Sequence, residues 1–521
     1  MKVFFIQARN KKEDRFVIHP PYGLMYLASV LRNSSIEVQI YDANIKPQNT
    51  NDFFFQEIKE VVEQWQPDVI GIGGMTSSFC FFHEIAKKLK AAFPEIPLIG
   101  GGLIISAMPE VIMRQTVIDA GCIGEAEETI VDLVNSIVKR LPLDQIPNLI
   151  LRQKDGEFLL TSGKASLNGR KKRTLESLDQ IPLPSYDLID LKAYLPHQSF
   201  CGDLLRSHFH RKKLDPKQIE FITPYAMPLF AGRGCPFNCI FCFSTMDKKP
   251  TKHSVDYVIK HLEYLEKQYG INHFQFLDEN FNFNRDWVIE FCNKIISQKK
   301  NYFFTTGNRN RAGFFDKEML ELMKKANFYE TSVGVESLDD EMLSEMGRCQ
   351  VSDNILSDLK MIKEVGIEQE HIRCLFGFPS DSKKTIFSTI KKGNSIGYKT
   401  LFALVIPLPG TKLFHKSLEK GIIKNELDYL EELFSEDGYR NLTSFNSLHD
   451  VQKIIYRANN YSQRDYLWRN KSYLAWLNHW MLYAAKELLL KLLEVTKLKN
   501  YVKSFLSGLN SKKPQAGIRK E

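Results

Sequence analysis

The sequence predicts an α/β protein with two successive arrays of strands and helices, followed by a mainly helical segment. In residues 1–140, short apolar runs alternate with longer amphipathic stretches, the pattern of a doubly wound parallel sheet. Residues 225–421 repeat this alternation in six units. Prolines interrupt residues 141–224, so we expect a linker there. Residues 422–521 are expected to form a helical C-terminal region with a basic tail.

Composition is that of an ordinary globular protein. Hydrophobic residues make up 43% of the chain, and no apolar run reaches the roughly 18 residues that a membrane span needs. The net charge of +8 is spread over mixed acidic and basic residues, so we expect no nucleic-acid partner. Nine cysteines, an odd number with three in one cluster, do not suggest a disulfide framework. With no signal peptide, this predicts a cytoplasmic protein.

The first array is expected to hold a ligand at the carboxyl ends of its strands. We expect strands at residues 3–6, 37–41, 69–72 and 98–100, and helices at 22–32, 54–64 and 82–92. Glycines follow the third and fourth strands, where missing Cβ atoms let a bulky, flat ligand approach the backbone. No Gly-x-Gly-x-x-Gly follows the first strand, which argues against a dinucleotide. A flavodoxin-like domain with glycine turns and no ligand remains the alternative.

The second array places polar residues at the ends of several strands. Its strands are expected at residues 225–231, 273–277, 302–306, 330–335, 371–376 and 401–406, with a helix at 255–269 that Ser254 caps. Polar candidates follow the second, third and fourth strands: Asp278, Glu279, Arg309, Glu336 and Ser337. Because barrel chemistry sits at the carboxyl ends of the strands, these side chains should share one site.

Three cysteines follow the first strand of this array, at the spacing Cys235-x-x-x-Cys239-x-x-Cys242. Thiolates bind zinc, copper or iron–sulfur clusters, so the number of ligands decides between them. Three thiolates around a 4Fe–4S cluster would leave one iron open to another ligand. The alternative is a structural zinc site, which needs a fourth ligand such as His253 or Cys201.

The stretch Arg233-Gly234-Cys235-Pro236-Phe237-Asn238-Cys239 resembles the signature of the radical S-adenosylmethionine (radical SAM) enzymes, particularly the class B radical SAM methyltransferases that carry a cobalamin-binding domain. Residues 21–28, with the sequence Pro-Tyr-Gly-Leu-Met-Tyr-Leu-Ala, and residues 124–129, Gly-Glu-Ala-Glu-Glu-Thr, resemble elements of that domain. Ala126 stands where the family usually has glycine. No Asp-x-His-x-x-Gly occurs, so the resemblance implies cobalamin without a histidine ligand on its lower face.

The resemblance implies a partial (α/β)6 TIM-type barrel and three cofactors, namely a 4Fe–4S cluster, S-adenosylmethionine and cobalamin. It places the cluster on the three cysteines and S-adenosylmethionine near the polar strand-end residues. For cobalamin it implies the residues Tyr22, Gly23, Gly101, Gly102, Gly124 and Glu125. The hydroxyls of Thr76 and Ser77, after the third strand, can donate to the same ligand.

The family resemblance also implies an activity. Most members are methyltransferases in which a 5′-deoxyadenosyl radical takes a hydrogen atom from an unactivated carbon, which then accepts a methyl group from methylcobalamin. Two alternatives stay open: a cobalamin enzyme that cyclises or rearranges without methylation, and a non-enzymatic cobalamin or redox sensor. We expect a small-molecule or lipid substrate and a reductant such as flavodoxin or ferredoxin. The sequence assigns no catalytic residue.

The C-terminal region could contact a membrane. Trp468, Trp476 and Trp480 lie close together and precede a Leu- and Lys-rich stretch at residues 484–499. Tryptophans beside a basic amphipathic helix are typical of a protein that lies on the inner membrane face. The alternative is a helix whose aromatic side chains pack on the barrel.

Overall fold

The computed structural model describes residues 1–10, 19–47, 49–153, 155–161, 177–194, 226–243, 249–367, 369, 371–433, 438–470, 476–482 and 484–485, with only the backbone of 308, 309 and 470. Cys201 and most of the expected helix at residues 484–499 lie outside these ranges.

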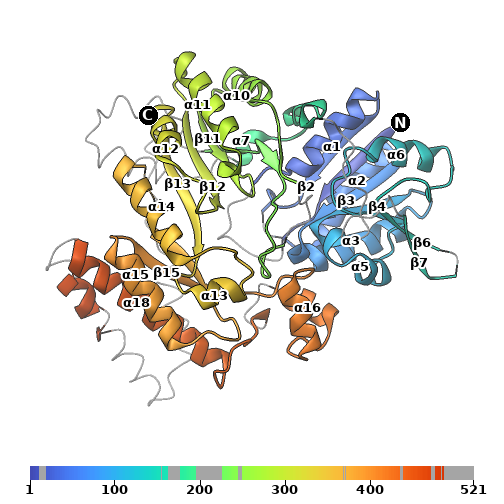
Figure 1. The fold of residues 1–521 in the computed structure, drawn as a ribbon. Coiled ribbons are helices and arrows are strands. Elements are labelled where there is room, and N and C mark those ends of the chain that lie inside the picture. Colours follow the sequence, from blue (N-terminus) through green and yellow to red (C-terminus); the bar gives the residue numbers. More distant parts are fainter. Residues whose placement is uncertain are drawn as a thin grey trace, which may run out of the picture.

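The N-terminal unit is a seven-stranded sheet in the order β2-β1-β3-β4-β5-β6-β7 (Figure 1). Its strands are β1 Lys2–Gln7, β2 Glu37–Asp42, β3 Val69–Gly74, β4 Leu98–Gly102, β5 Ala120–Cys122, β6 Leu149–Arg152 and β7 Phe158–Leu160. The first five pair in parallel, which confirms the predicted doubly wound sheet. Separate apolar clusters cover its two faces, as such a sheet requires.

The helices of this unit are α1 Tyr22–Asn33, α2 Asn51–Trp65, α3 Phe79–Ala92, α4 Leu103–Ala107, α5 Pro109–Gln115 and α6 Ile130–Val138. The sheet continues beyond the expected boundary at residue 140, because β6 and β7 add an antiparallel hairpin to β5. Arg152 holds this hairpin against α5, with its guanidinium donating to the carbonyls of Met113 and Thr116.

The second unit is a six-stranded parallel sheet in the order β15-β14-β13-β12-β11-β8. Its strands are β8 Met227–Leu229, β11 His273–Phe276, β12 Phe303–Asn310, β13 Phe328–Glu336, β14 His371–Phe376 and β15 Lys399–Leu404. The strands neighbour one another in chain order, and β8 and β15 are the two edges, so the barrel is partial as predicted. Rings of Phe274, Phe276, Phe304 and Phe328 stack on the face of the sheet that packs against the helices, where Phe291 contacts three of them.

The barrel helices are α10 Val255–Tyr269, α11 Arg285–Ser297, α12 Lys317–Lys325, α13 Asp340–Glu345, α14 Ser352–Val365 and α15 Lys383–Ser395. The Ser254 side chain accepts from the Tyr257 amide, which confirms the expected cap of α10. Between the two units, Tyr186 of the connecting segment bonds to the buried His261 on α10 at 2.8 Å. The connection is therefore packed into the barrel surface.

The C-terminal helices belong to both units. Helices α16 Lys412–Glu419 and α17 Glu426–Glu432 contribute Phe414, Tyr429 and Leu430 to an apolar cluster of the N-terminal unit. Helix α18 Leu448–Asn470 instead covers the edge strand β15, where the Asn459 side chain accepts from the Phe402 amide and donates to its carbonyl. This protects an edge that would otherwise expose unpaired backbone groups. Across the described ranges, every helix is too short or too polar to span a bilayer.

Candidate cofactor sites

The cysteine loop is anchored at both ends. It leaves β9 Gly232–Arg233 and returns through β10 Thr251–Lys252, and these strands pair antiparallel. Midway, the Ile240 amide donates to the Met346 carbonyl, and the Ile240 carbonyl accepts from the Leu413 amide. Gly347 has φ of +70°, and a Cβ there would lie 2.8 Å from the Asn238 carbonyl oxygen. The loop therefore rests on two later segments of the chain, one after β13 and one after β15.

The three cysteines lie on this loop at the carboxyl end of β8. Cys235 and Cys239 are half-buried and Cys242 is exposed. Within the described ranges, no three His, Cys, Asp or Glu side chains are arranged to hold a single metal ion. A 4Fe–4S cluster takes its protein ligands as thiolates from closely spaced cysteines. Three thiolates on an anchored loop suit such a cluster.

His253 does not serve the zinc alternative. Its ring is buried, stacks on Tyr257 with centroids 3.9 Å apart, and contacts the Asp179 carboxylate through Nδ1 at 3.3 Å. It therefore packs inside the protein, beneath the helix that follows the loop.

Asp278 and Glu279 border a cavity of about 230 Å³ beside the cysteine loop. The two oxygens of Asp278 are both engaged, one by the Ala231 amide at 2.7 Å and the other by Lys252 Nζ at 2.8 Å. Glu279 accepts from the Gly234 amide at 3.2 Å, and burial raises the pKa of its carboxyl. The buried Asn280 also lines the cavity, and its Nδ2 has no hydrogen-bond partner among the described residues. These groups could receive a polar ligand.

Glu336 and Ser337 lie at the end of β13. Glu336 is 4% exposed, has φ of +60° and faces Arg348, with 3.7 Å between Oε1 and Nη1. A non-glycine residue in this left-handed conformation is strained, and such strain is common at functional sites. The hydroxyl of Ser337 accepts from the Asp339 amide and contacts the Thr389 hydroxyl at 3.4 Å.

The expected position of Arg309 is corrected by the structure. We expected Gly307-Asn308-Arg309 to follow a strand, but β12 runs through them to Asn310, with an irregular register against β13. The Arg309 side chain is outside the described set. Two residues later, Arg311 Nη1 donates to Cys239 Sγ at 3.7 Å. Sequence reasoning missed Arg311, although the Arg-x-Arg spacing could have suggested it.

The carboxyl edge of the N-terminal sheet leaves room beside its glycines. A Cβ on Gly23 or Gly101 would meet nothing within 4 Å. Met75, directly after β3, is 45% exposed although it is large and apolar. Missing side chains and an uncovered methionine together fit the flat corrin ring of cobalamin.

Other residues of this edge hold its loops in place. Gly102 has φ of +83°, and a Cβ there would lie 2.7 Å from the Gly74 carbonyl oxygen. The Gly124 amide donates to Ser106 Oγ at 2.8 Å. Ser77 Oγ donates to Asn10 Oδ1 at 3.0 Å, and the neighbouring Thr76 is buried.

The two edges meet across buried charges. Arg233, which precedes the cysteine loop, pairs with Glu127 at 2.6 Å and Glu125 at 3.4 Å. Its guanidinium also lies 5.0 Å from the centre of the Tyr26 ring. Tyr22 is buried, and its hydroxyl donates to the Pro228 carbonyl in the barrel. Hence Glu125 and Tyr22, expected at the cobalamin site, also join the domains.

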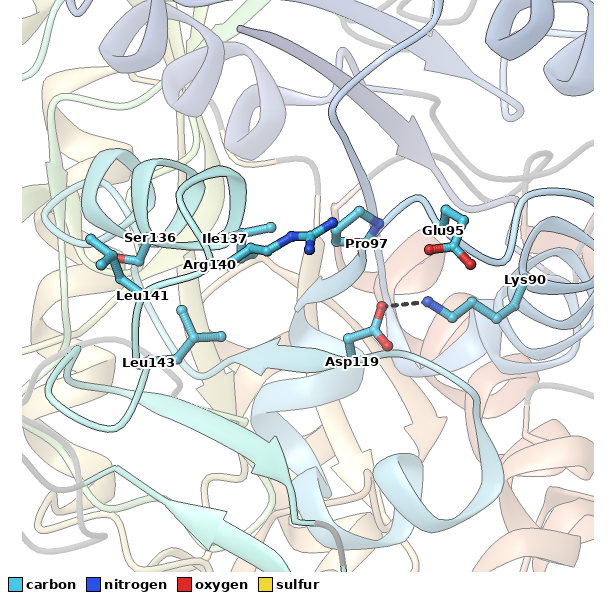
Figure 2. A pocket seen from close by; sticks show the side chains of 9 residues that line it. All are labelled: Lys90, Glu95, Pro97, Asp119, Ser136, Ile137, Arg140, Leu141 and Leu143. Carbon is cyan, nitrogen blue, oxygen red and sulfur yellow. Dashed lines mark hydrogen bonds and ion pairs between the residues drawn. The ribbon is translucent and has the colours of Figure 1, made fainter.

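A further hollow, of about 340 Å³, lies at the other edge of the N-terminal sheet (Figure 2). Two of its lining residues, Pro97 and Asp119, directly precede β4 and β5. Lys90 bridges to Asp119 at 2.8 Å. This hollow is at the amino ends of the strands, so it is separate from the glycine edge.

Comparisons with known proteins agree with this architecture. The family model described as B12 binding domain matches residues 14–134, and that of the Radical SAM superfamily matches residues 229–392. The chain is 28% identical over 409 residues to an uncharacterized methyltransferase, PH0819, of Pyrococcus horikoshii, covering 78% of this chain and 80% of the relative. It is 24% identical over 414 residues to the anaerobic magnesium-protoporphyrin IX monomethyl ester cyclase of Rubrivivax gelatinosus, covering 77% and 67%.

Its fold is also similar to a solved structure of the radical S-adenosylmethionine methyltransferase TsrM from Kitasatospora setae with cobalamin and a 4Fe–4S cluster bound. The TM-score is 0.65 at 17% identity, over 81% of this chain and 75% of that one. The matched domains and the two edges described above lead to one assignment. The chain belongs to the radical SAM enzymes that carry a cobalamin-binding domain, and its cofactors are cobalamin, a 4Fe–4S cluster and S-adenosylmethionine.

Proposed function

We propose that this enzyme methylates an unactivated carbon of a small-molecule or lipid substrate. The cofactors supply the chemistry: S-adenosylmethionine provides a 5′-deoxyadenosyl radical that removes a hydrogen atom, and methylcobalamin donates the methyl group. The observation that carries the proposal is the meeting of the two carboxyl edges. Arg233 joins the cysteine loop to Glu125 and Glu127 of the cobalamin-binding domain by largely buried ion pairs.

A second contact supports the same arrangement. Gly410, after the last barrel strand, lies against the end of α4, so that a Cβ there would be 3.0 Å from the Ala107 carbonyl oxygen. Residues following β4 and β5 thus face residues following β8 and β15. A substrate held between these loops would be reachable from both edges and shielded from water.

For this chain's own residues, we propose three tasks. Cys235, Cys239 and Cys242 ligate the cluster. Asp278, Glu279, Arg309, Glu336 and Ser337 border the S-adenosylmethionine site, where the Glu279 carboxylate at the cavity suits an ammonium group. Tyr22, Gly23, Thr76, Ser77, Gly101, Gly102, Gly124 and Glu125 form and support the cobalamin site.

The proposal is tested with S-adenosylmethionine carrying a deuterated methyl group. The enzyme, reconstituted anaerobically with iron, sulfide and cobalamin, is incubated with a reductant such as flavodoxin and a metabolite and lipid extract. We expect S-adenosylhomocysteine and 5′-deoxyadenosine to form together, and one extract component to gain the labelled methyl group. The Cys235/Cys239/Cys242→Ala variant is the control and should yield no 5′-deoxyadenosine.

A second candidate is a cobalamin-dependent cyclisation or rearrangement without methylation. The similarity to a protein named as a magnesium-protoporphyrin monomethyl ester cyclase favours it. It predicts a converted substrate and 5′-deoxyadenosine with neither the label nor S-adenosylhomocysteine in the products. That result would overturn methyl transfer.

We further propose that the C-terminal tryptophans touch a membrane surface. Trp468 is 59% exposed and Trp480 is 44% exposed, and Met481 and Leu482 beside it are also exposed. Residues 462 and 465 bond to α15, so truncating α18 would damage the barrel. Trp468→Ser/Trp480→Ser is therefore the better variant. We expect wild type, but not this variant, to float with anionic liposomes; equal flotation would contradict the contact.

A further inference from the structure

Arg311 points at the cluster-binding loop from the barrel. It follows β12, is 6% exposed and donates from Nη1 to Cys239 Sγ at 3.7 Å. Its guanidinium carbon also lies 3.6 Å from the centre of the Phe237 ring, which belongs to the same loop. One buried cation thus contacts both a cluster ligand and the aromatic ring two residues before it.

The backbone of Arg311 is held on both sides. Its amide donates to Asn280 Oδ1 at 3.2 Å, and its carbonyl accepts from Nδ2 of the fully buried Asn282 at 3.1 Å. Phe237 in turn packs against Phe283 and Phe314. Because the residue and its ring partner are both fixed, the contact with Cys239 is built into the fold.

Neighbouring cations have carboxylate partners. Lys252 pairs with Asp278, and Arg348 pairs with Glu336. In the described part of the chain, the Arg311 guanidinium donates to the sulfur of Cys239 and not to a carboxylate. Charge-assisted hydrogen bonds are stronger than neutral ones, and hydrogen bonds to cluster sulfurs help to set the reduction potential.

We propose that Arg311 donates to the Cys239 thiolate in the loaded enzyme and thereby raises the reduction potential of the 4Fe–4S cluster. Reduction adds negative charge to the cluster and its sulfurs, which a fixed guanidinium stabilises. Arg311 is a positioning and tuning residue, because it acts through a cluster ligand. This role is independent of whether the product is methylated.

The test is an EPR-monitored redox titration of reconstituted wild type and Arg311→Met. We expect the variant to keep about four irons per chain, with its midpoint potential shifted to more negative values. Arg311→Lys keeps the positive charge but lacks the planar guanidinium that stacks on Phe237. Its midpoint potential should lie between those of wild type and Arg311→Met. Arg373→Met removes an exposed arginine on β14 and should keep the wild-type midpoint.

An iron-replete Arg311→Met variant with the wild-type midpoint would overturn the proposal. If Arg311→Met loses iron, the midpoint potential of Arg311→Lys is measured instead. An iron-replete Arg311→Lys with the wild-type midpoint potential would also overturn the proposal. Failure to detect methyl transfer would leave this outcome unaffected, because the measured quantity is the cluster potential.

Discussion

At the carboxyl edge of the N-terminal sheet, room is made by missing side chains, whereas the carboxyl end of the barrel is bordered by buried charges. Gly23 and Gly101 leave open space, since a Cβ on either residue would meet nothing within 4 Å. In the barrel, Asp278, Glu336 and Arg311 are each buried and each contact an oppositely charged group or a thiolate. The first edge suits a large flat cofactor recognised by shape, and the second suits small charged cofactors recognised by polarity.

The largest expected effect is the loss of one cofactor while the other is kept. Cys235/Cys239/Cys242→Ala should lose the iron and retain cobalamin, since no residue of the glycine edge is changed. Iron, sulfide and cobalamin contents after anaerobic purification measure both. Zinc in place of iron in the wild type, or loss of cobalamin with the iron, would break the comparison.

Gly101→Val should lose cobalamin and keep the iron. The added side chain meets no protein atom near its Cβ and suits a strand, so the fold should be kept while the cobalamin site is filled. We expect cobalamin binding to be lost at full iron content, measured by the absorption spectrum of the loaded protein.

The matched variant is Gly102→Ala. There the positive φ and the 2.7 Å approach to Gly74 should lower the melting temperature. If Gly101→Val binds cobalamin like the wild type, the glycine edge is not the site.

Arg233→Met tests the connection between the edges. It removes the ion-pair partner of Glu127, whose side chain is 8% exposed, so we expect a loss of about 3 kcal/mol in the free energy of unfolding. Chemical denaturation measures the loss, and adding Glu127→Gln should restore part of it.

Arg32→Met is the control, because its pair with Asp187 is exposed and should contribute less than about 1 kcal/mol. Equal effects of the two arginine variants would contradict a buried connection.

The smallest effect concerns pH. Burial lowers the pKa of His261 from its ordinary value of 6.5 to about 3. Below pH 6.5 the unfolded chain therefore takes up a proton on His261 that the folded chain excludes. The free energy of unfolding is thus highest above pH 6.5 and falls below it. At pH 5 the loss should be about 2 kcal/mol. Urea unfolding at both pH values measures it, and His261→Asn should show a smaller pH dependence.

Much of the candidate site could be predicted because its signals are local. The six barrel strands and the first four strands of the N-terminal sheet were expected from apolar runs. Each is present with small shifts at its ends, except that β12 continues past residue 306 to Asn310. The cysteine spacing pointed to a cluster since all three ligands lie in one loop. The β6–β7 hairpin was missed because it consists of two short strands in a stretch that otherwise looks irregular.

By itself, the sequence determined the α/β class, the order of the domains and the choice of cofactors, because each depends on residues close together in the chain. Tertiary structure alone decided which charges meet: Arg233 with Glu127, 106 positions away, and Arg311 with Cys239, 72 positions away. It also decided that β12 runs past residue 306 and that α16 and α17 pack on the N-terminal unit. Pairings over such separations depend on how the sheets are stacked, and no local pattern carries that information.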